Sequence, residues 1–130
     1  MEAVAKLRNC PMSARKMRMV VDTIRGKKVD QALGILKYTN REAGGWLEKV
    51  LVSAVANWEN NSGSLNADNY DLVVSKVWVD EGTTLKRFQA APHGRAHRIR
   101  KRTNHVTLVV QNRVAIPKDQ KAVANNEEEE

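Results

Sequence analysis

Residues 82–113 form a long stretch without a single acidic side chain, and this stretch constrains the fold more than any other part of the chain. Seven fixed positive charges lie between Lys86 and Arg102, and apolar residues stay sparse until the run from Val106 to Val110. The few apolar side chains before Val106 cannot cover both faces of a two-stranded ribbon, and an isolated hairpin is marginally stable in water. The sequence therefore predicts a basic arm that a negatively charged partner completes.

Charge is distributed unevenly along the chain. The 130 residues have a formal net charge of +7, but residues 1–113 hold 20 Lys and Arg against 10 Asp and Glu, while residues 114–130 hold 2 against 5. A small basic body favours a polyanion such as nucleic acid as its partner. Because the length suits one domain, we expect a single RNA-binding domain over residues 1–113, with a body (1–81 and 104–113) and an extended hairpin (82–103). Residues 114–130 are expected to be a flexible acidic tail.

One cysteine and no long apolar run limit the classes to which the protein can belong. Cys10 is the only cysteine, so the chain forms no internal disulfide and no cysteine-based zinc site, which suits a reducing compartment. The N-terminus lacks a secretory signal, and no segment approaches the ~18 apolar residues of a membrane-spanning helix. We therefore expect a cytoplasmic protein with no membrane partner.

Two short helices are predicted in the first 40 residues. The first follows Ser13, whose hydroxyl suits an N-cap because it accepts hydrogen bonds from the free amides of the first turn, and the helix ends at Gly26. A second helix is expected over residues 30–38. The buried stripe of the first helix is Met17, Val20, Val21 and Ile24, and the inner face of the second is Ala32, Leu33 and Leu36.

A third helix, for which Asn40 is the expected cap, has the broadest apolar face in the chain. At helical spacing its two tryptophans favour a place in the core over a platform on which bases stack. Gly44 and Gly45 favour close packing near its start, and the polar residues 57–71 predict an exposed loop after it. The apolar face consists of Trp46, Leu47, Val50, Leu51, Ala54, Val55 and Trp58.

Three strands are expected. Residues 2–8 alternate partly and predict a short strand that Pro11 ends, and β-branched residues predict strands over residues 72–79 and 106–110. Residues 80–82 interrupt the second strand as a bulge or bend would.

The second and third strands are too far apart in sequence to be joined by a tight turn. Their antiparallel pairing must therefore continue outward through residues 83–103, with a turn near residues 90–94, where Pro92 and Gly94 supply turn geometry. At ~3.3 Å per residue, the hairpin reaches ~30 Å beyond the body.

No arrangement in the sequence predicts an enzyme, a metal site or a cofactor. A glycine-rich phosphate loop is missing. His93 and His97 have a spacing that suits a metal only on a helix, which the neighbouring proline and glycine oppose. Asp80 and Glu81 face opposite sides of a strand, which is a poor start for paired acid–base chemistry. Cys10 has no histidine partner.

The candidate RNA-binding residues are cations of the arm, of the first helix and of the turn that follows it. The planar guanidinium of arginine bridges phosphates and stacks on bases. Folded RNA offers phosphate-lined crevices in which a narrow ribbon can lodge. The predicted RNA-binding residues are Arg15, Lys16, Arg18, Lys27, Lys28, Lys86, Arg87, Arg95, Arg98, Arg100, Lys101 and Arg102.

Two motifs carry a resemblance to a known family. The segments SARKMRMVVDTIRGKKVDQALGILKYTNREA and VWVDEGTTLKRFQAAPHGRAHRIRKRTNHVTLVV resemble the ribosomal protein L twenty-two family of the large subunit. The resemblance covers residues 2–113. It implies an α+β fold in which three helices pack on a small three-stranded antiparallel sheet with a long protruding β-hairpin. The residues that match the family's arm motif are Lys86, Arg87, Gly94, Arg95, Ala96, Arg98, Lys101, Arg102 and Thr103.

The same resemblance implies a structural role in the cytoplasmic ribosome. The partners would be large-subunit rRNA, neighbouring large-subunit proteins and the nascent polypeptide, and the family acts in early subunit assembly. The hairpin would run inward through RNA, and its tip would help to line the polypeptide exit tunnel. The implied tunnel-lining residues are Phe88, Gln89, Ala90, Ala91, Pro92, His93, Gly94 and Arg95.

Two other classes of function compete with this interpretation. A free-standing DNA- or RNA-binding regulator would need a recognition helix with outward-facing cations, for which the first helix, with Arg15, Lys16, Arg18 and Arg25, is the one candidate. An enzyme would have to use Asp80, Glu81 and the histidines. Deletion of residues 84–100 distinguishes the first alternative, because a regulator would still bind DNA without its arm.

Overall fold

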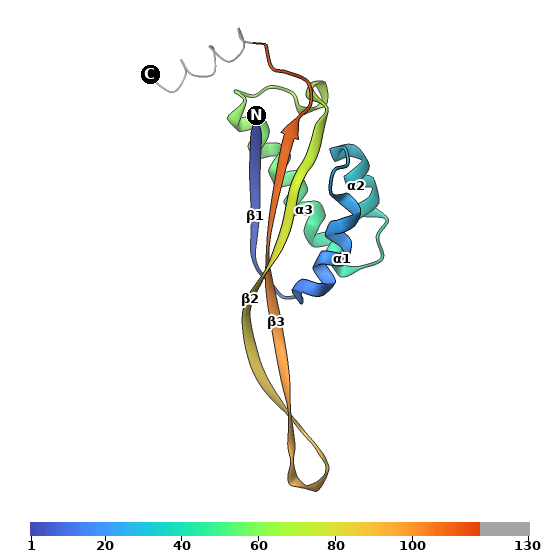
Figure 1. Ribbon diagram of the computed structural model, residues 1–130, viewed down its shortest axis with the longest axis vertical. Helices are drawn as coiled ribbons and strands as arrows, with labels where there is room; N and C mark the ends of the chain where they lie inside the picture. The colour runs from blue at the N-terminus through green and yellow to red at the C-terminus, as the bar shows by residue number, and fades with distance from the viewer. Residues whose placement is uncertain (118–130) are drawn as a thin grey trace, which may run out of the picture.

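A three-stranded antiparallel sheet in the order β1-β3-β2 organises the molecule, and three helices pack on one of its faces. The computed structural model describes residues 1–117 (Figure 1). The expected α+β fold, with a small sheet, three helices and a long hairpin, is confirmed. The elements are β1 (Glu2–Cys10), α1 (Ala14–Ile24), α2 (Val29–Lys37), α3 (Glu42–Asn61), the 3-10 turns Ala67–Tyr70 and Pro92–Gly94, β2 (Leu72–Ala90) and β3 (Ala96–Asn112).

The core lies between the sheet and the helices. β3 is the central strand and contributes Val106, Leu108 and Val110, which are fully buried. On β1, Ala3 and Ala5 face the same core, opposite Val110 and Leu108 in the strand register. α3 lies across β1 and α1 lies along β2, so each edge strand receives its own helix. Burial of these apolar side chains is the main source of stability for the body.

α1 has the predicted buried stripe. Met17, Val20, Val21 and Ile24 are all buried. The helix ends at Ile24, with Arg25 extended at the C-cap position, and Gly26 follows with φ of +77° while its amide donates to the carbonyl oxygen of Val74 on β2 at 2.9 Å. Ser13 stands at the N-cap position, but its hydroxyl makes no capping hydrogen bond, so that part of the prediction is wrong.

The start of α3 packs closely on the end of α2. A Cβ atom added at Gly44 would lie 3.0 Å from the carbonyl oxygen of Leu36, whereas one added at Gly45 would meet nothing within 4 Å. The expected close approach is therefore real at the first glycine only. Further along α3, Trp58 is fully buried against Tyr70, with ring centroids 5.5 Å apart, which confirms that this tryptophan belongs to the core.

The region around α3 departs from the sequence prediction at both ends. Its N-cap position is Arg41 rather than Asn40. At its other end the helix continues to Asn61, and a 3-10 turn follows over Ala67–Tyr70, so the expected exposed loop over residues 57–71 is wrong for much of its length. The reason is tertiary packing, because burial of Trp58 continues the helix beyond the point where its polar residues begin.

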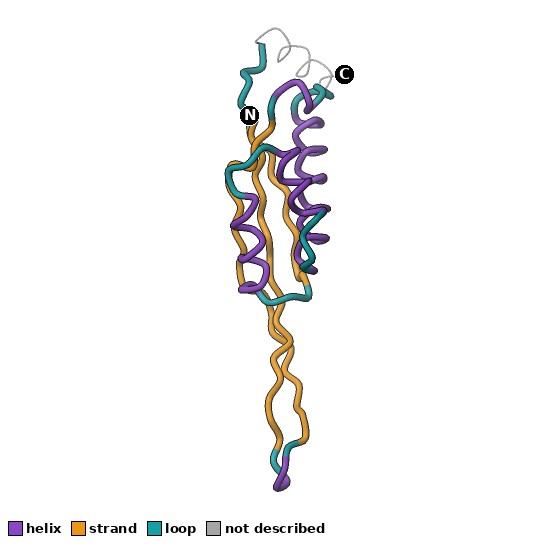
Figure 2. The backbone as a smooth tube through the Cα atoms, turned by 90° about the vertical axis from the view of Figure 1, so that its right-hand side faces the viewer, coloured by secondary structure: helices purple, strands orange, loops and turns teal. Residues whose placement is uncertain are grey.

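β2 and β3 continue beyond the body as a narrow two-stranded ribbon (Figures 1 and 2). Their antiparallel pairing extends from Leu72 opposite Asn112 to Ala90 opposite Ala96. The register shifts twice, between Val74 and Lys76 and between Glu81 and Thr84. The second shift confirms the predicted irregularity around Gly82. We call the ribbon from Thr83 to Thr103 the arm. The expected outward continuation of the hairpin, with a turn near residues 90–94, is confirmed.

The chain leaves the sheet beside the 3-10 turn that precedes β2. The backbone amide of Val114 donates to the carbonyl oxygen of Tyr70 at 3.4 Å, and Ile116 packs against the core. Most of the predicted acidic tail, residues 118–130, lies outside the described residues. Within residues 1–117, no helix has the length and apolar composition needed to cross a membrane.

Candidate nucleic-acid interface

The root of the arm is tied to the body by several hydrogen bonds. Asn104 is fully buried, and its side-chain amide donates to the carbonyl oxygen of Met12 at 2.7 Å. The Thr103 hydroxyl donates to the Thr83 carbonyl oxygen at 2.6 Å, across the ribbon. The backbone amide of Asn9 donates to Nδ1 of His105 at 3.0 Å. The bonds of Asn104 and His105 join β3 at the root of the arm to β1 and to the segment that follows it, and the Thr103 bond joins the two strands where the arm begins.

Gly82 lies at the same root, where the backbone and two side chains approach closely. A Cβ atom at this position would collide with Oγ1 of Thr103 and would lie 3.2 Å from the ring of His105. Glycine is therefore required here for space, and the bulge that the sequence predicted has a packing reason.

Directly paired residues of an antiparallel ribbon lie on the same face, so the register assigns the arm's side chains to two faces. One face carries the pairs Lys86–Arg100, Phe88–Arg98 and Thr84–Arg102. The other carries Leu85–Lys101, Arg87–Ile99 and Gln89–His97. The first face, which we call the basic face, therefore concentrates four of the arm's cations around one phenylalanine.

The basic face is electrostatically unfavourable for the protein alone. Lys86 lies directly opposite Arg100, and like charges that face each other across a strand pair are destabilising. Phe88 is 72% exposed. A polyanion would relieve the repulsion, and an aromatic side chain beside arginines suits a nucleic-acid base. This face can therefore bind phosphate and stack on bases.

A basic cleft connects the arm to α1. Its volume is about 350 Å³, and it lies between the start of α1 and the base of the arm. One carboxylate, from Glu42, faces four cations there. Ser13, at the N-cap position of α1, lines the same cleft, and the N-terminus of a helix favours an anion. The cations of the cleft are Lys16, Arg100, Lys101 and Arg102.

The structure divides the twelve predicted RNA-binding residues into two groups. Within residues 1–117, the side chains of nine of them make no hydrogen bond or ion pair, and all nine residues are exposed. The other three have partners in the protein. The nine are Arg15, Lys16, Lys27, Lys86, Arg95, Arg98, Arg100, Lys101 and Arg102.

The three partnered cations are Arg18, Lys28 and Arg87. The Arg18 guanidinium donates through Nη2 to the carbonyl oxygen of Val79 at 2.9 Å. The Lys28 ammonium pairs with Asp71 at 3.0 Å, and Arg87 donates to the backbone carbonyl of Lys86 at 2.9 Å. Arg18 thus binds β2 of its own protein.

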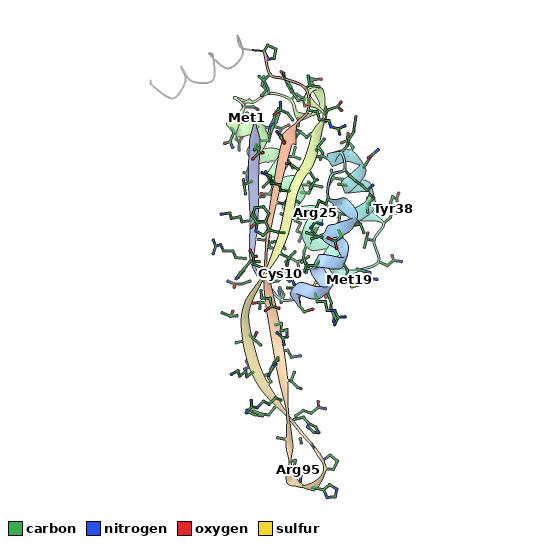
Figure 3. All side chains as sticks on the ribbon, in the orientation of Figure 1. Met1, Cys10, Met19, Arg25, Tyr38 and Arg95 are labelled. Carbon is green, nitrogen blue, oxygen red and sulfur yellow. The ribbon has the colours of Figure 1, made fainter. Side chains whose placement is uncertain are left out.

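Arg25, which the predicted RNA-binding set did not include, makes the same kind of contact as Arg18, two residues away along β2. Its Nη2 donates to the carbonyl oxygen of Val77 at 3.0 Å, and its Nη1 bonds to Asp22 at 2.7 Å. β2 is an edge strand, so its outward carbonyl groups lack a strand partner, and these two arginines of α1 supply donors for them. Figure 3 shows Arg25 beside β2. A recognition helix would need these cations to face outward, so this contact argues against the regulator alternative.

The predicted tunnel-lining residues occupy the outer end of the arm. Phe88 to Ala90 are the last residues of β2, and the chain then turns through Pro92–Gly94, with the Ala91 amide donating to the Arg95 carbonyl oxygen at 2.9 Å. His93 and Gly94 both have positive φ, of 63° and 66°. Figure 3 shows Arg95 at the tip, far from the body. The turn brings these residues together at the end of the arm.

The groups considered for catalysis do not form a reactive site. Among the described residues, no group of three or more His, Cys, Asp or Glu side chains could hold a metal ion. Burial raises the pKa of the Cys10 thiol, the Glu42 carboxylate adds to this effect, and a hydrogen bond from Asn104 opposes it. A cysteine with a raised pKa is a poor nucleophile. His105 accepts a backbone hydrogen bond and has a structural role.

Comparisons with known proteins point to one family. The family model described as ribosomal protein L22p/L17e matches residues 5–111. A protein from Christiangramia forsetii is 56% identical over 108 residues, which cover 83% of this chain and 80% of that protein. A protein from Bacteroides fragilis is 55% identical over 106 residues, which cover 82% and 77% of the two chains. A protein from Porphyromonas gingivalis is 56% identical over 106 residues, which cover 82% and 78%. All three are named large ribosomal subunit protein uL22.

Proposed function

The chain belongs to the L22p/L17e family of ribosomal proteins, and we propose that it is a structural constituent of the large ribosomal subunit that binds large-subunit rRNA through its arm. The observation that carries the proposal is the basic face, on which Lys86 lies opposite Arg100 with no acidic residue in the arm to neutralise either charge. A ribbon of this kind is stabilised by phosphate and not by its own side chains. The mechanism is therefore electrostatic and geometric.

The body and the arm have different tasks in this proposal. The helices and the sheet form a rigid base, and the bond from Asn104 to Met12 holds the root of the arm against that base. The exposed cations of the arm and of the basic cleft each neutralise phosphates, so separate RNA segments are joined through one protein. A ribbon that joins RNA segments in this way supports assembly of the subunit.

The tip has a further proposed task, which is to line the polypeptide exit tunnel and contact the nascent polypeptide. Gly94 and Arg95 match the family's arm motif, which supports this assignment, and so does the exposure of Phe88 and Arg95 at the end of the ribbon. The body lies too far from the tip to contribute to the same surface (Figure 1).

A charge-neutralising variant tests the rRNA-binding proposal. We expect Arg98→Gln with Lys101→Gln and Arg102→Gln to weaken binding to large-subunit rRNA and to flatten the slope of log affinity against log salt concentration by about 2–3. A matched control removes three cations from the helical side of the body, by Lys37→Gln, Arg41→Gln and Lys49→Gln, and should leave the slope nearly unchanged. Equal slopes for the two triple variants would reject the assignment of the arm. Sedimentation with large subunits at low and high salt checks the same proposal in the assembled particle.

Cross-linking tests the proposed tunnel surface. A photoreactive group attached to a cysteine at position 88 should label a nascent chain in stalled ribosomes. The same group at position 38, where the side chain of Tyr38 is 83% exposed on the body, should not. Labelling from position 38 and none from position 88 would contradict the tunnel assignment without affecting rRNA binding.

A further inference from the structure

An apolar groove opens on the body at the opposite end of β2 from the tip of the arm. It has a volume of about 310 Å³ and lies between the start of α2, the second half of α3, the 3-10 turn Ala67–Tyr70 and the beginning of β2. Val52 on its edge is 54% exposed, and Leu33 and Val55 are half-buried in its wall. Apolar surface of this kind in a concave site is typical of a binding surface.

The charge around this groove is opposite to that of the arm. Four of the ten acidic residues in residues 1–113 line it, against one lysine. The lysine, Lys28, is already paired with Asp71 at 3.0 Å, so the uncompensated charge is negative. The acidic residues of the groove are Asp30, Glu59, Asp68 and Asp71.

The wall of the groove is held in place by the protein's own bonds. Oε1 of Glu59 accepts a hydrogen bond from the backbone amide of Ala67 at 3.2 Å, which fixes the 3-10 turn against α3. Tyr70, in the same turn, packs on the buried ring of Trp58. Because the turn is fixed at both points, the groove is a pre-formed surface that a partner can enter without a large rearrangement.

The charge of the groove selects among possible occupants. RNA phosphate is disfavoured by four carboxylates, and the exposed valine offers it no hydrogen bond. The chain's own residues 118–130 hold five acidic residues against two lysines, so they would be repelled as well. The favoured occupant is a segment in which apolar side chains lie between lysines or arginines. Its apolar side chains would be buried on Val52 and Leu33, and its cations would pair with the acidic residues of the groove, which we call the acidic rim.

We propose that this groove docks a basic, apolar peptide segment of a neighbouring protein in the large subunit. The inference rests on the proposed place of the chain in that particle, and it adds a protein-binding surface at the end of the molecule opposite the RNA-binding arm. The size of the groove suits a short segment, such as a terminal extension, rather than the surface of a folded domain.

Site-specific cross-linking in assembled large subunits tests the proposal. Full-length protein with Val52 replaced by p-benzoylphenylalanine is incorporated into subunits and irradiated, and the cross-linked peptide is identified by mass spectrometry. We expect a segment of another ribosomal protein that contains apolar residues flanked by lysine or arginine. A cross-link to rRNA, to residues 118–130 of the same chain or to an acidic segment, or no cross-link, would overturn the proposal.

A second position separates failure of this inference from failure of the proposed function. The same photoreactive residue in place of Lys101, on the arm, should cross-link to rRNA in subunits prepared in the same way. If position 101 labels rRNA and position 52 labels no basic protein segment, the groove proposal alone fails. If the protein is not incorporated or position 101 labels no RNA, the proposed function fails, and the groove proposal fails with it.

Charge variants test the role of the acidic rim. Asp30→Asn together with Asp68→Asn should reduce the yield of the cross-link from position 52 several-fold, because the basic flanks of the segment lose their partners. Glu48→Gln with Glu81→Gln removes the same charge from outside the groove and should leave the yield unchanged. An equal yield for both pairs would contradict electrostatic selection by the groove.

Discussion

β2 and β3 run through both the body and the arm, but their side chains are buried in the first and exposed in the second. Val77, Val106 and Leu108 lie in the core, whereas Leu85 and Phe88 are 54% and 72% exposed on the same strands. The backbone pairing is nearly continuous through both regions. Strand pairing alone therefore sets the shape of the arm, while burial of apolar surface stabilises the body. One region is sufficient for its own stability, and the other depends on a partner.

Removal of the arm should produce the largest effect and tests this comparison most directly. Replacing Leu85 to Lys101 by an Asn-Gly turn joins Thr84 to Arg102, which are already paired, and removes six cations. We expect large-subunit rRNA affinity to fall on the order of a thousandfold at physiological salt. The thermal unfolding midpoint of the body should hardly change, because its core loses no side chain. Filter binding and circular dichroism measure the two quantities, and an unfolded body would refute its independence.

Two leucines provide a matched pair for the stability of the two regions. Leu51 is fully buried in the core, whereas Leu85 is 54% exposed on the arm. Leu51→Ala should lower the free energy of unfolding by about 2–5 kcal/mol, because it leaves a cavity. Leu85→Ala should change it by no more than about 0.5 kcal/mol. Urea denaturation of the free protein measures both, and a large loss from the arm variant would show that the arm belongs to the same cooperative core.

A substitution at Gly82 tests the junction between the body and the arm, and Gly45 on α3 provides the control. Gly82→Ala forces a Cβ atom against Thr103 and His105 at the arm root, and we expect it to destabilise the protein by about 1–3 kcal/mol. Gly45→Ala places a Cβ atom in open space on α3 and should stabilise the protein by about 0.5–1 kcal/mol. Denaturant unfolding gives both values. If Gly82→Ala were neutral, the arm root would be looser than the hydrogen bonds around it indicate.

The sequence predicted the parts of the molecule whose signals are local. The stripe from Met17 to Ile24 repeats at helical spacing, and the distance between the β-branched segments required a long hairpin with its turn near Pro92. Both are confirmed because periodicity and turn chemistry are written in neighbouring residues. The helix past Asn57 was missed, because it depends on the contact of Trp58 with Tyr70, which comes from another part of the chain.

The sequence predicted which residue types form the candidate interface, but it did not predict the contacts that those residues make. A run of cations identifies the arm, but the pairing register decides that Lys86, Arg98 and Arg100 share one face. Arg18 was expected to bind RNA, whereas the approach of α1 to an edge strand gives it a carbonyl partner within the protein. The acidic groove was also beyond reach, because Asp30 and Glu59 are brought together only by helix packing. The sequence shows which residues are charged, but the fold is needed to identify the group that each charge contacts.

Cys10 allows the smallest of these effects to be measured. It lies buried where the arm leaves the body (Figure 3), and burial raises the pKa of its thiol. Above the ordinary thiol pKa of about 8.5, the unfolded chain loses this proton while the folded chain keeps it. The free energy of unfolding should therefore fall from about pH 8 to 10, relative to Cys10→Ala, by roughly 1 kcal/mol or less. A cysteine on the arm, Phe88→Cys combined with Cys10→Ala, should show no such fall, because its thiol ionises equally in both states. If the buried and the exposed thiol gave the same pH dependence of the free energy of unfolding, the body would not exclude water from Cys10. The difference in burial between the body and the arm would then not extend to the point where they meet.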